Sequence, residues 1–147
     1  MTTGMDPAMD PGMDPAERAW RALRALVHDQ YDTKAEVSAA LGMSFLRVKA
    51  IGLLSGSALS LRTLATRLIC DPPYATVIVD DLVSRGLAVR SPNPADGRSR
   101  LVTLTPAGHR AAAEADRILG TPPPAFAALD PADLATLSEI LSRITGQ

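Results

Sequence analysis

The chain has 147 residues, of which 46% are hydrophobic, and is long enough and apolar enough to form one globular domain. Its formal net charge is −1, so no global excess of basic residues marks it as a nucleic-acid-binding protein. The single cysteine excludes an internal disulfide framework and suits a reducing compartment. There is no apolar run of membrane-spanning length and no pattern of a secretory leader, so we expect a cytoplasmic protein.

Residues 1–13 contain a repeated Met-Asp-Pro motif and carry an acidic excess. Proline interrupts helices, and the segment lacks the bulky side chains that a packed core needs. We therefore expect an acidic, disordered tail, with a partner-binding arm as the alternative.

A long helix is predicted after this tail. Asp14 is a suitable N-cap, Pro15 suits the first helical position, and the apolar pattern continues to about Leu41. The stripe consists of Trp20, Leu23, Val27 and Tyr31. His28 lies on the same helix, either as an ordinary core or surface histidine or as a ligand or proton sensor, although no companion stands at metal-ligand spacing.

Three shorter helices are predicted next. Gly42 ends the long helix and Ser44 caps the first of the three, whose sequence is apolar on one side and basic on the other. Ser60 caps the second, and Asp71, followed by prolines, caps the third. Both of these last two helices have one apolar face, made by Leu61, Leu64, Ala65 and Leu68 and by Ala75, Ile78, Val79 and Leu82. Cys70, in the turn between them, is either a small buried residue or a redox switch.

A β-hairpin is predicted directly after these helices. The third helix ends at Arg85 and Gly86, and residues 87–90 and 101–104 have the composition of two short strands. The stretch between them, from Pro92 to Gly97, is rich in turn residues. Two helices joined by a tight turn and followed by such a hairpin form a winged helix-turn-helix.

The hairpin and its exit resemble a known family. Asp96-Gly97-Arg98 in the loop and Leu104-Thr105-Pro106-Ala107-Gly108 after the second strand are similar to the wing of the MarR family of bacterial regulators. The resemblance implies a mainly α fold with a small β-hairpin wing. It further implies one domain over residues 14–147, with the winged helix-turn-helix at about 44–105 and dimerisation helices at about 14–42 and 106–146.

Two helices are predicted after the wing. Thr105 caps the first, which extends to about Leu119 before residues 120–124 stop it, whereas family members usually have a longer helix here. Asp130 starts the last helix, whose seam of Leu134, Leu137, Leu141 and Ile144 suits packing against another helix, within the chain or in a second copy. The resemblance favours a homodimer.

The candidate site residues lie on the winged helix-turn-helix. The solvent face of the third short helix offers base or phosphate contacts in a DNA major groove, and Arg98 suits the minor groove. Arg62 and Arg100 are candidates for phosphate contacts, and by resemblance so is Lys49; Asp96 and Gly97 are assigned structural roles in the wing. The DNA-binding candidates are Arg62, Pro73, Tyr74, Thr76, Val77, Arg98, Arg100 and Lys49.

Asp80 and Asp81 oppose this interpretation, because they face away from the core on the expected recognition helix and would repel phosphates. Members of the family often carry a basic residue at the position of Asp81. Either the two carboxylates lie clear of the DNA backbone, or they pair with Arg85 across one helical turn.

The sequence thus predicts a DNA-binding transcriptional regulator, most consistent with a repressor, that binds a pseudo-palindromic operator as a homodimer. By resemblance, a small lipophilic or aromatic effector would release it. A winged-helix protein-interaction module without specific DNA binding is the alternative. We expect no enzyme, metal or cofactor, because no nucleophile motif, phosphate-binding glycine loop or metal-ligand spacing is present.

Overall fold

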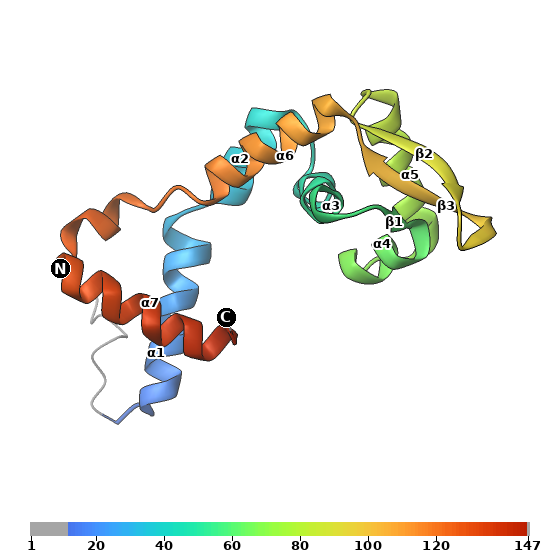
Figure 1. Ribbon diagram of the computed structural model, residues 1–147. Coiled ribbons are helices and arrows are strands. Elements are labelled where there is room, and N and C mark those ends of the chain that lie inside the picture. The colour runs from blue at the N-terminus through green and yellow to red at the C-terminus, as the bar shows by residue number, and fades with distance from the viewer. Residues whose placement is uncertain (1–11, 147) are drawn as a thin grey trace, which may run out of the picture.

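The computed structural model describes residues 12–146, and the predicted tail therefore lies almost wholly outside the described residues. The described chain is mainly helical, with one small antiparallel sheet (Figure 1). The elements are α1 (Pro15–Arg24), a π-helix η2 (Ala25–Gln30), α2 (Thr33–Leu41), α3 (Phe45–Gly56), β1 (Leu59–Ser60), α4 (Leu61–Leu68), α5 (Pro72–Ser84), β2 (Ala88–Asn93), β3 (Asp96–Leu104), α6 (Pro106–Leu119), a 3₁₀-helix η3 (Pro124–Ala128) and α7 (Pro131–Thr145).

The predicted helix starts are largely confirmed by their capping bonds. The side chains of Asp14, Ser60, Asp71, Thr105 and Asp130 each accept a hydrogen bond from a backbone N–H in the first turn. Ser44 stands at the N-cap of α3 but makes no such bond. Its hydroxyl instead accepts from the Arg47 guanidinium at 3.0 Å, so the arginine replaces the backbone as its partner.

The prediction of one helix from Asp14 to about Leu41 was wrong. The chain passes from α1 into a π-helical turn, becomes extended at Tyr31 and begins α2 afresh. Asp32 causes the new start, because its carboxylate accepts the Ala35 N–H at 2.9 Å and so caps α2. As a result α2 belongs to the core, through Val37, whereas α1 contains no buried residue.

The hairpin is longer than predicted, and a short third strand joins it. β3 lies between β1 and β2, and Leu59 pairs with Val102 while Ala88 pairs with Leu104. Pairing continues to Pro92 opposite Arg100 and, after a register shift, to Asn93 opposite Asp96, so the turn shrinks to residues 94–95. β1 has only two residues, and two residues are too few to carry an alternating pattern.

The core lies between α2 to α6 and the sheet, and the predicted apolar faces of α4 and α5 are part of it. The largest fully buried side chains are Ile51, Leu64, Ile78, Leu82, Val37, Val48, Val79 and Val102.

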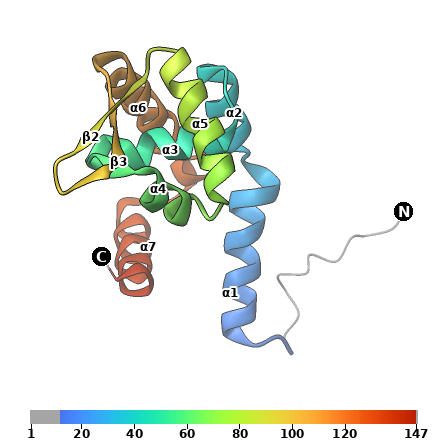
Figure 2. The same ribbon diagram turned by 90° about the vertical axis from the view of Figure 1, so that its right-hand side faces the viewer.

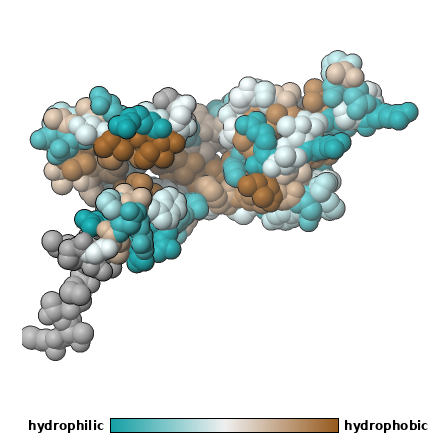
Figure 3. Space-filling model, turned by 90° about the horizontal axis from the view of Figure 1, so that it is seen from below, coloured by the Kyte–Doolittle hydropathy of each residue, from teal (hydrophilic) through white to brown (hydrophobic). Residues whose placement is uncertain are grey.

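Two arms extend from this body. α1 with η2 forms one and α7 forms the other, and they lie apart from each other (Figure 2). Neither α1, η2 nor α7 contains a buried residue. Hydrophobic surface gathers on the part of the molecule that the arms form (Figure 3), where Trp20 is 64% and Ile144 70% exposed. No single helix within residues 12–146 is long and apolar enough to span a membrane.

Candidate nucleic-acid interface

Helix α5 presents the predicted outer face. Asp71 caps it through a 2.7 Å bond from the Tyr74 N–H, and Pro72 and Pro73 fill its first two positions. The face opposite the core is open, with Tyr74 42% and Val77 50% exposed. The Thr76 hydroxyl donates to the Pro72 carbonyl at 3.1 Å, which leaves its oxygen lone pairs and methyl group as the outward features.

The wing is held by bonds within its own turn. The Asp96 carboxylate accepts the Arg98 N–H at 3.1 Å, and the Asn93 side-chain oxygen accepts the Ala95 N–H at 3.0 Å. Asn93 also donates to the Ser99 hydroxyl at 2.8 Å. Asp96 thus fixes the loop backbone from which Arg98 projects. Gly97 has an ordinary φ, and a Cβ there would meet nothing, so its conformation does not require glycine.

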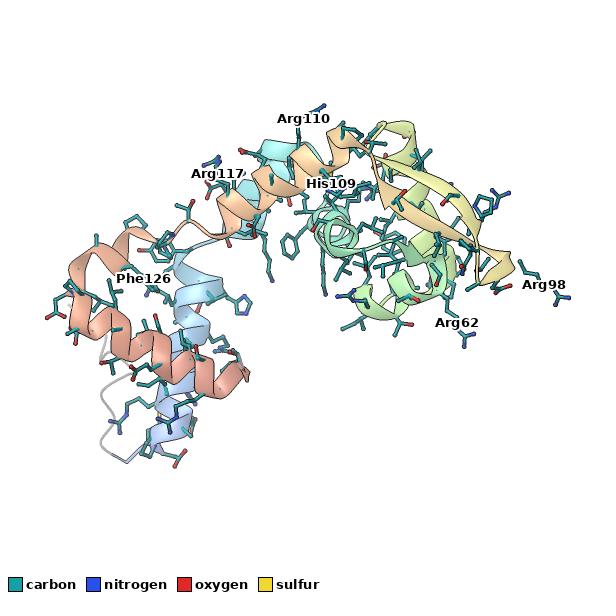
Figure 4. The ribbon with its side chains drawn as sticks, viewed as in Figure 1. Arg62, Arg98, His109, Arg110, Arg117 and Phe126 are labelled. Carbon is teal, nitrogen blue, oxygen red and sulfur yellow. The ribbon has the colours of Figure 1, made fainter. Side chains whose placement is uncertain are left out.

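Arg62, Arg98 and Arg100 converge on one surface. They line a hollow of about 480 Å³ between the start of α4 and the wing. Arg62 and Arg98 point outward from this end of the molecule, whereas Arg110 lies on α6 (Figure 4). Within the part of the chain that the structure describes, none of the three forms an ion pair. Their charges therefore remain available to an anionic partner.

Both aspartates of α5 are neutralised by arginines. Asp80 pairs with Arg90 of β2 at 2.7 Å. Asp81 pairs with Arg85 at 2.9 Å, as the i, i+4 spacing predicted, and also with Arg47 of α3 at 2.7 Å. The expected repulsion of phosphates is correspondingly weakened, and the outer face of α5 is less acidic than its sequence indicates.

The partners Arg47 and Arg90 were missed at the sequence level. Arg47 belongs to the basic side of its helix, and its partner lies 34 residues away in the chain. Arg90 is ten residues from Asp80, across the bend into the wing. No spacing rule links residues so far apart, so only the packing of α3 and β2 against α5 identifies these pairs.

Lys49 lies apart from the arginine hollow. It belongs to a groove of about 610 Å³ between α3 and α6, whose wall includes Phe45, Leu53, His109 and Leu119. Beyond the groove on α6, a hydrogen bond from Arg117 lowers the pKa of the exposed Glu114 carboxyl. His28 is exposed, and Cys70 is half-buried rather than buried. Within residues 12–146 no three His, Cys, Asp or Glu side chains cluster as a metal site would require.

Comparison with known proteins supports the resemblance of the wing. The sequence model of the MarR family matches residues 55–99, which include α4, α5 and most of the wing. No curated protein matches the chain.

Several solved structures share the fold. Apo wild-type MarR from E. coli is 22% identical, with 90% of this chain and 98% of that chain covered and a TM-score of 0.69. The transcriptional regulator BldR from Sulfolobus solfataricus is 24% identical, with 89% and 99% covered and a TM-score of 0.60. S. aureus MepR in its complex with DNA is 16% identical, with 84% and 98% covered and a TM-score of 0.59. The MarR resemblance is therefore confirmed: residues 55–99 match the sequence model of the MarR family, and the chain has the fold of the solved MarR structures.

Proposed function

We propose that the chain is a DNA-binding transcriptional regulator. The observation that carries this proposal is the charge arrangement of one surface. The acidic side chains on α5 are paired with arginines of the same chain. Arg62, Arg98 and Arg100, by contrast, line one hollow and form no ion pair in the described chain. Such a surface attracts phosphates despite the net charge of −1. The MarR-fold structure of S. aureus MepR with DNA supports the same conclusion.

In this proposal α5 enters the major groove. Tyr74 contacts a base or a phosphate, Val77 a thymine methyl group, and Thr76 a base edge as acceptor, with Pro73 against the backbone. Arg98 enters the minor groove at the wing, while Arg62 and Arg100 bind phosphates. Contact of Lys49 with a phosphate stays a prediction, because it faces the groove between α3 and α6.

We further propose a homodimer built from the arms. Helices α1 and α7 contain no buried residue, and Trp20, Ile140 and Ile144 are all exposed. A second copy is the occupant that these apolar faces fit, since the same seams are repeated on it. The two recognition helices of such a dimer would bind a pseudo-palindromic operator with half-sites about one helical turn apart.

Repression in the cytoplasm and release by a small molecule complete the proposal. The groove between α3 and α6 is lined by side chains of these two helices, and its wall is largely aliphatic. A lipophilic or aromatic effector bound there would shift the equilibrium between two spacings of the recognition helices. Competition of such compounds against operator binding, measured by fluorescence anisotropy, tests this part.

A protein-interaction module is the second candidate. It is favoured by the exposed apolar arms and by a net charge that is close to zero. It differs from the first candidate in needing neither Arg98 nor the outer face of α5.

A gel-shift titration across a salt series distinguishes the two functions. The probes are duplex fragments of the DNA that flanks the gene of this protein, with an unrelated duplex of equal length as the control. We expect at least one fragment to bind more tightly than the control, with an affinity that falls steeply as salt increases. A stable dimer that binds no fragment at any salt concentration would support the interaction module instead.

A further inference from the structure

Asp81 lies at the centre of a network that joins α5 to the corner between α2 and α3. One carboxylate oxygen, Oδ2, accepts from Arg47 Nε at 2.7 Å and from Arg85 Nε at 2.9 Å. Arg85 Nη1 then donates to the Gly42 carbonyl at 3.0 Å, and Arg47 Nη1 donates to the Ser44 hydroxyl at 3.0 Å. Each arginine therefore spans from α5 to the corner.

The corner is the end of the helix that follows the first arm. Gly42 is the left-handed C-cap of α2, with φ 61°, and its carbonyl is among those that a helix end leaves without a partner within the helix. A guanidinium satisfies this carbonyl and complements the negative end of the helix dipole. The network thus fixes α5 relative to α2, the body helix nearest to the arm in sequence.

Breaking the network has a definite electrostatic consequence. The side chains of Asp81 and Arg47 are only 27% and 21% exposed, so water screens their attraction incompletely. Without the carboxylate, Arg47 and Arg85 would be two like charges directed at one point. Such charges repel and would move apart, and the restraint between α5 and the corner would be lost.

We propose that Asp81 is a positioning residue for DNA recognition, which sets the orientation of α5 relative to the α2–α3 corner and hence to the dimer arms. The inference rests on the proposed DNA-binding function. Simple electrostatics and the proposal predict opposite effects of removing Asp81. By electrostatics alone, removal of a negative charge from a recognition helix should strengthen binding to phosphates. If Asp81 positions the helix, its removal should weaken recognition of the specific site.

The test compares Asp81→Asn with Glu114→Gln, which removes an ion pair of the same 2.7 Å length that lies within α6 alone. Affinities are measured for the tightest-binding flanking fragment and for an unrelated duplex, together with the melting temperature. We expect Asp81→Asn to weaken binding to the flanking fragment about tenfold, the size typical of hydrogen bonds to charged groups, with binding to the unrelated duplex unchanged or tighter. Glu114→Gln should change neither.

A double-mutant cycle examines the partner. Arg47→Met keeps the apolar stem of the side chain and should weaken binding to the flanking fragment to a similar degree. The double variant should then be little worse than Asp81→Asn alone, because both substitutions remove the pair of Asp81 with Arg47. Unchanged or tighter binding to the flanking fragment by Asp81→Asn would overturn the proposal, as would an equal loss on both duplexes, which a general loss of structure produces.

A spectroscopic distance measurement keeps the proposal testable without DNA. Cys70→Ser removes the single cysteine, and spin labels are attached at Val77→Cys on α5 and Ala40→Cys on α2, in protein diluted with unlabelled chains. Asp81→Asn should broaden the distance distribution between the labels, and Glu114→Gln should not. If the wild-type chain binds no DNA, the proposed function fails. An unchanged distance distribution in the Asp81→Asn variant would, independently of DNA binding, overturn the positioning role of Asp81.

Discussion

Ile69 carries strain at the turn between α4 and α5. It is the one non-glycine residue with a positive φ among residues 12–146, at 57°, and its side chain is 88% exposed. It ends α4, where the Cys70 N–H bonds to the Ala65 carbonyl and closes the last turn. A left-handed conformation costs an L-residue about 1–2 kcal/mol, and so exposed a side chain recovers little of that by packing.

Replacement of Ile69 by glycine should therefore stabilise the protein. Glycine adopts this φ freely but loses more chain entropy on folding, so we expect the free energy of unfolding to rise by about 0.5–1 kcal/mol. Urea titration measures the change. Ile69→Ala, which keeps the Cβ and its steric conflict, should give a clearly smaller gain. A glycine variant less stable than the wild type would mean that the isoleucine side chain makes favourable contacts.

Gly108 is required for a close approach between α6 and the segment that joins α5 to β2. A Cβ at this position would overlap the Leu87 carbonyl oxygen and press on the Leu104 side chain. The same carbonyl accepts the Thr105 N–H at 3.0 Å, so it cannot withdraw without breaking the start of α6. This contact gives a physical reason for the glycine in the Leu-Thr-Pro-Ala-Gly exit.

Two glycine-to-alanine changes in helices should consequently have opposite effects. Gly108→Ala should lower the free energy of unfolding by about 2 kcal/mol or more, through overpacking. Gly52→Ala in α3, where a Cβ meets nothing within 4 Å, should raise it by about 0.5–1 kcal/mol through helix propensity. Thermal and urea unfolding of the matched pair provide the measurement, and equal effects would contradict the assigned contact.

At the scale of elements, the predictable features are those with local causes. Helix starts at Ser60, Asp71 and Thr105 follow from capping bonds within one turn, so the sequence identifies them. The break at Asp32 also has a local cause, but an uninterrupted apolar stripe concealed it. The pairing of β1 with β3 and the partners of Asp80 and Asp81 depend on packing between distant segments. Those features of the candidate site were therefore beyond sequence patterns.

The wing is the element whose role is most directly testable. Arg98 projects from a turn that Asp96 and Asn93 hold by bonds to its backbone, so its side chain contributes nothing to those bonds. Arg98→Ala should weaken DNA binding by about 1–3 kcal/mol without lowering the melting temperature. Arg110→Ala removes the same charge from α6, away from the hollow that Arg98 lines, and this variant should bind DNA normally (Figure 4). Equal affinity of the two variants would refute the assignment of the wing.

At the scale of the whole molecule, the single chain leaves two apolar helices without a core. The seam of α7 and the stripe along α1 and η2, whose apolar side chains are half-buried or exposed, extend from a body that is already closed around its own core. Because the arms contain no buried residue, we expect the body to fold without them, and association in the proposed dimer would recover the free energy of burying their apolar faces. Dimerisation and folding of the winged helix should thus be separable by mutation.

Ile144→Glu tests this separation. The residue is 70% exposed near the end of α7, so glutamate is tolerated in the monomer but places a charge in the proposed interface. We expect sedimentation to show a monomer at micromolar concentrations and circular dichroism to remain that of a folded helical protein. Trp20, the only tryptophan, reports the same event, because its emission should shift to the blue as the wild type associates and remain unshifted in the variant. Val89→Glu, at an exposed apolar position on the wing, is the control and should leave the dimer intact. If the Val89→Glu variant is also a monomer, the effect of Ile144→Glu does not identify the arms as the interface.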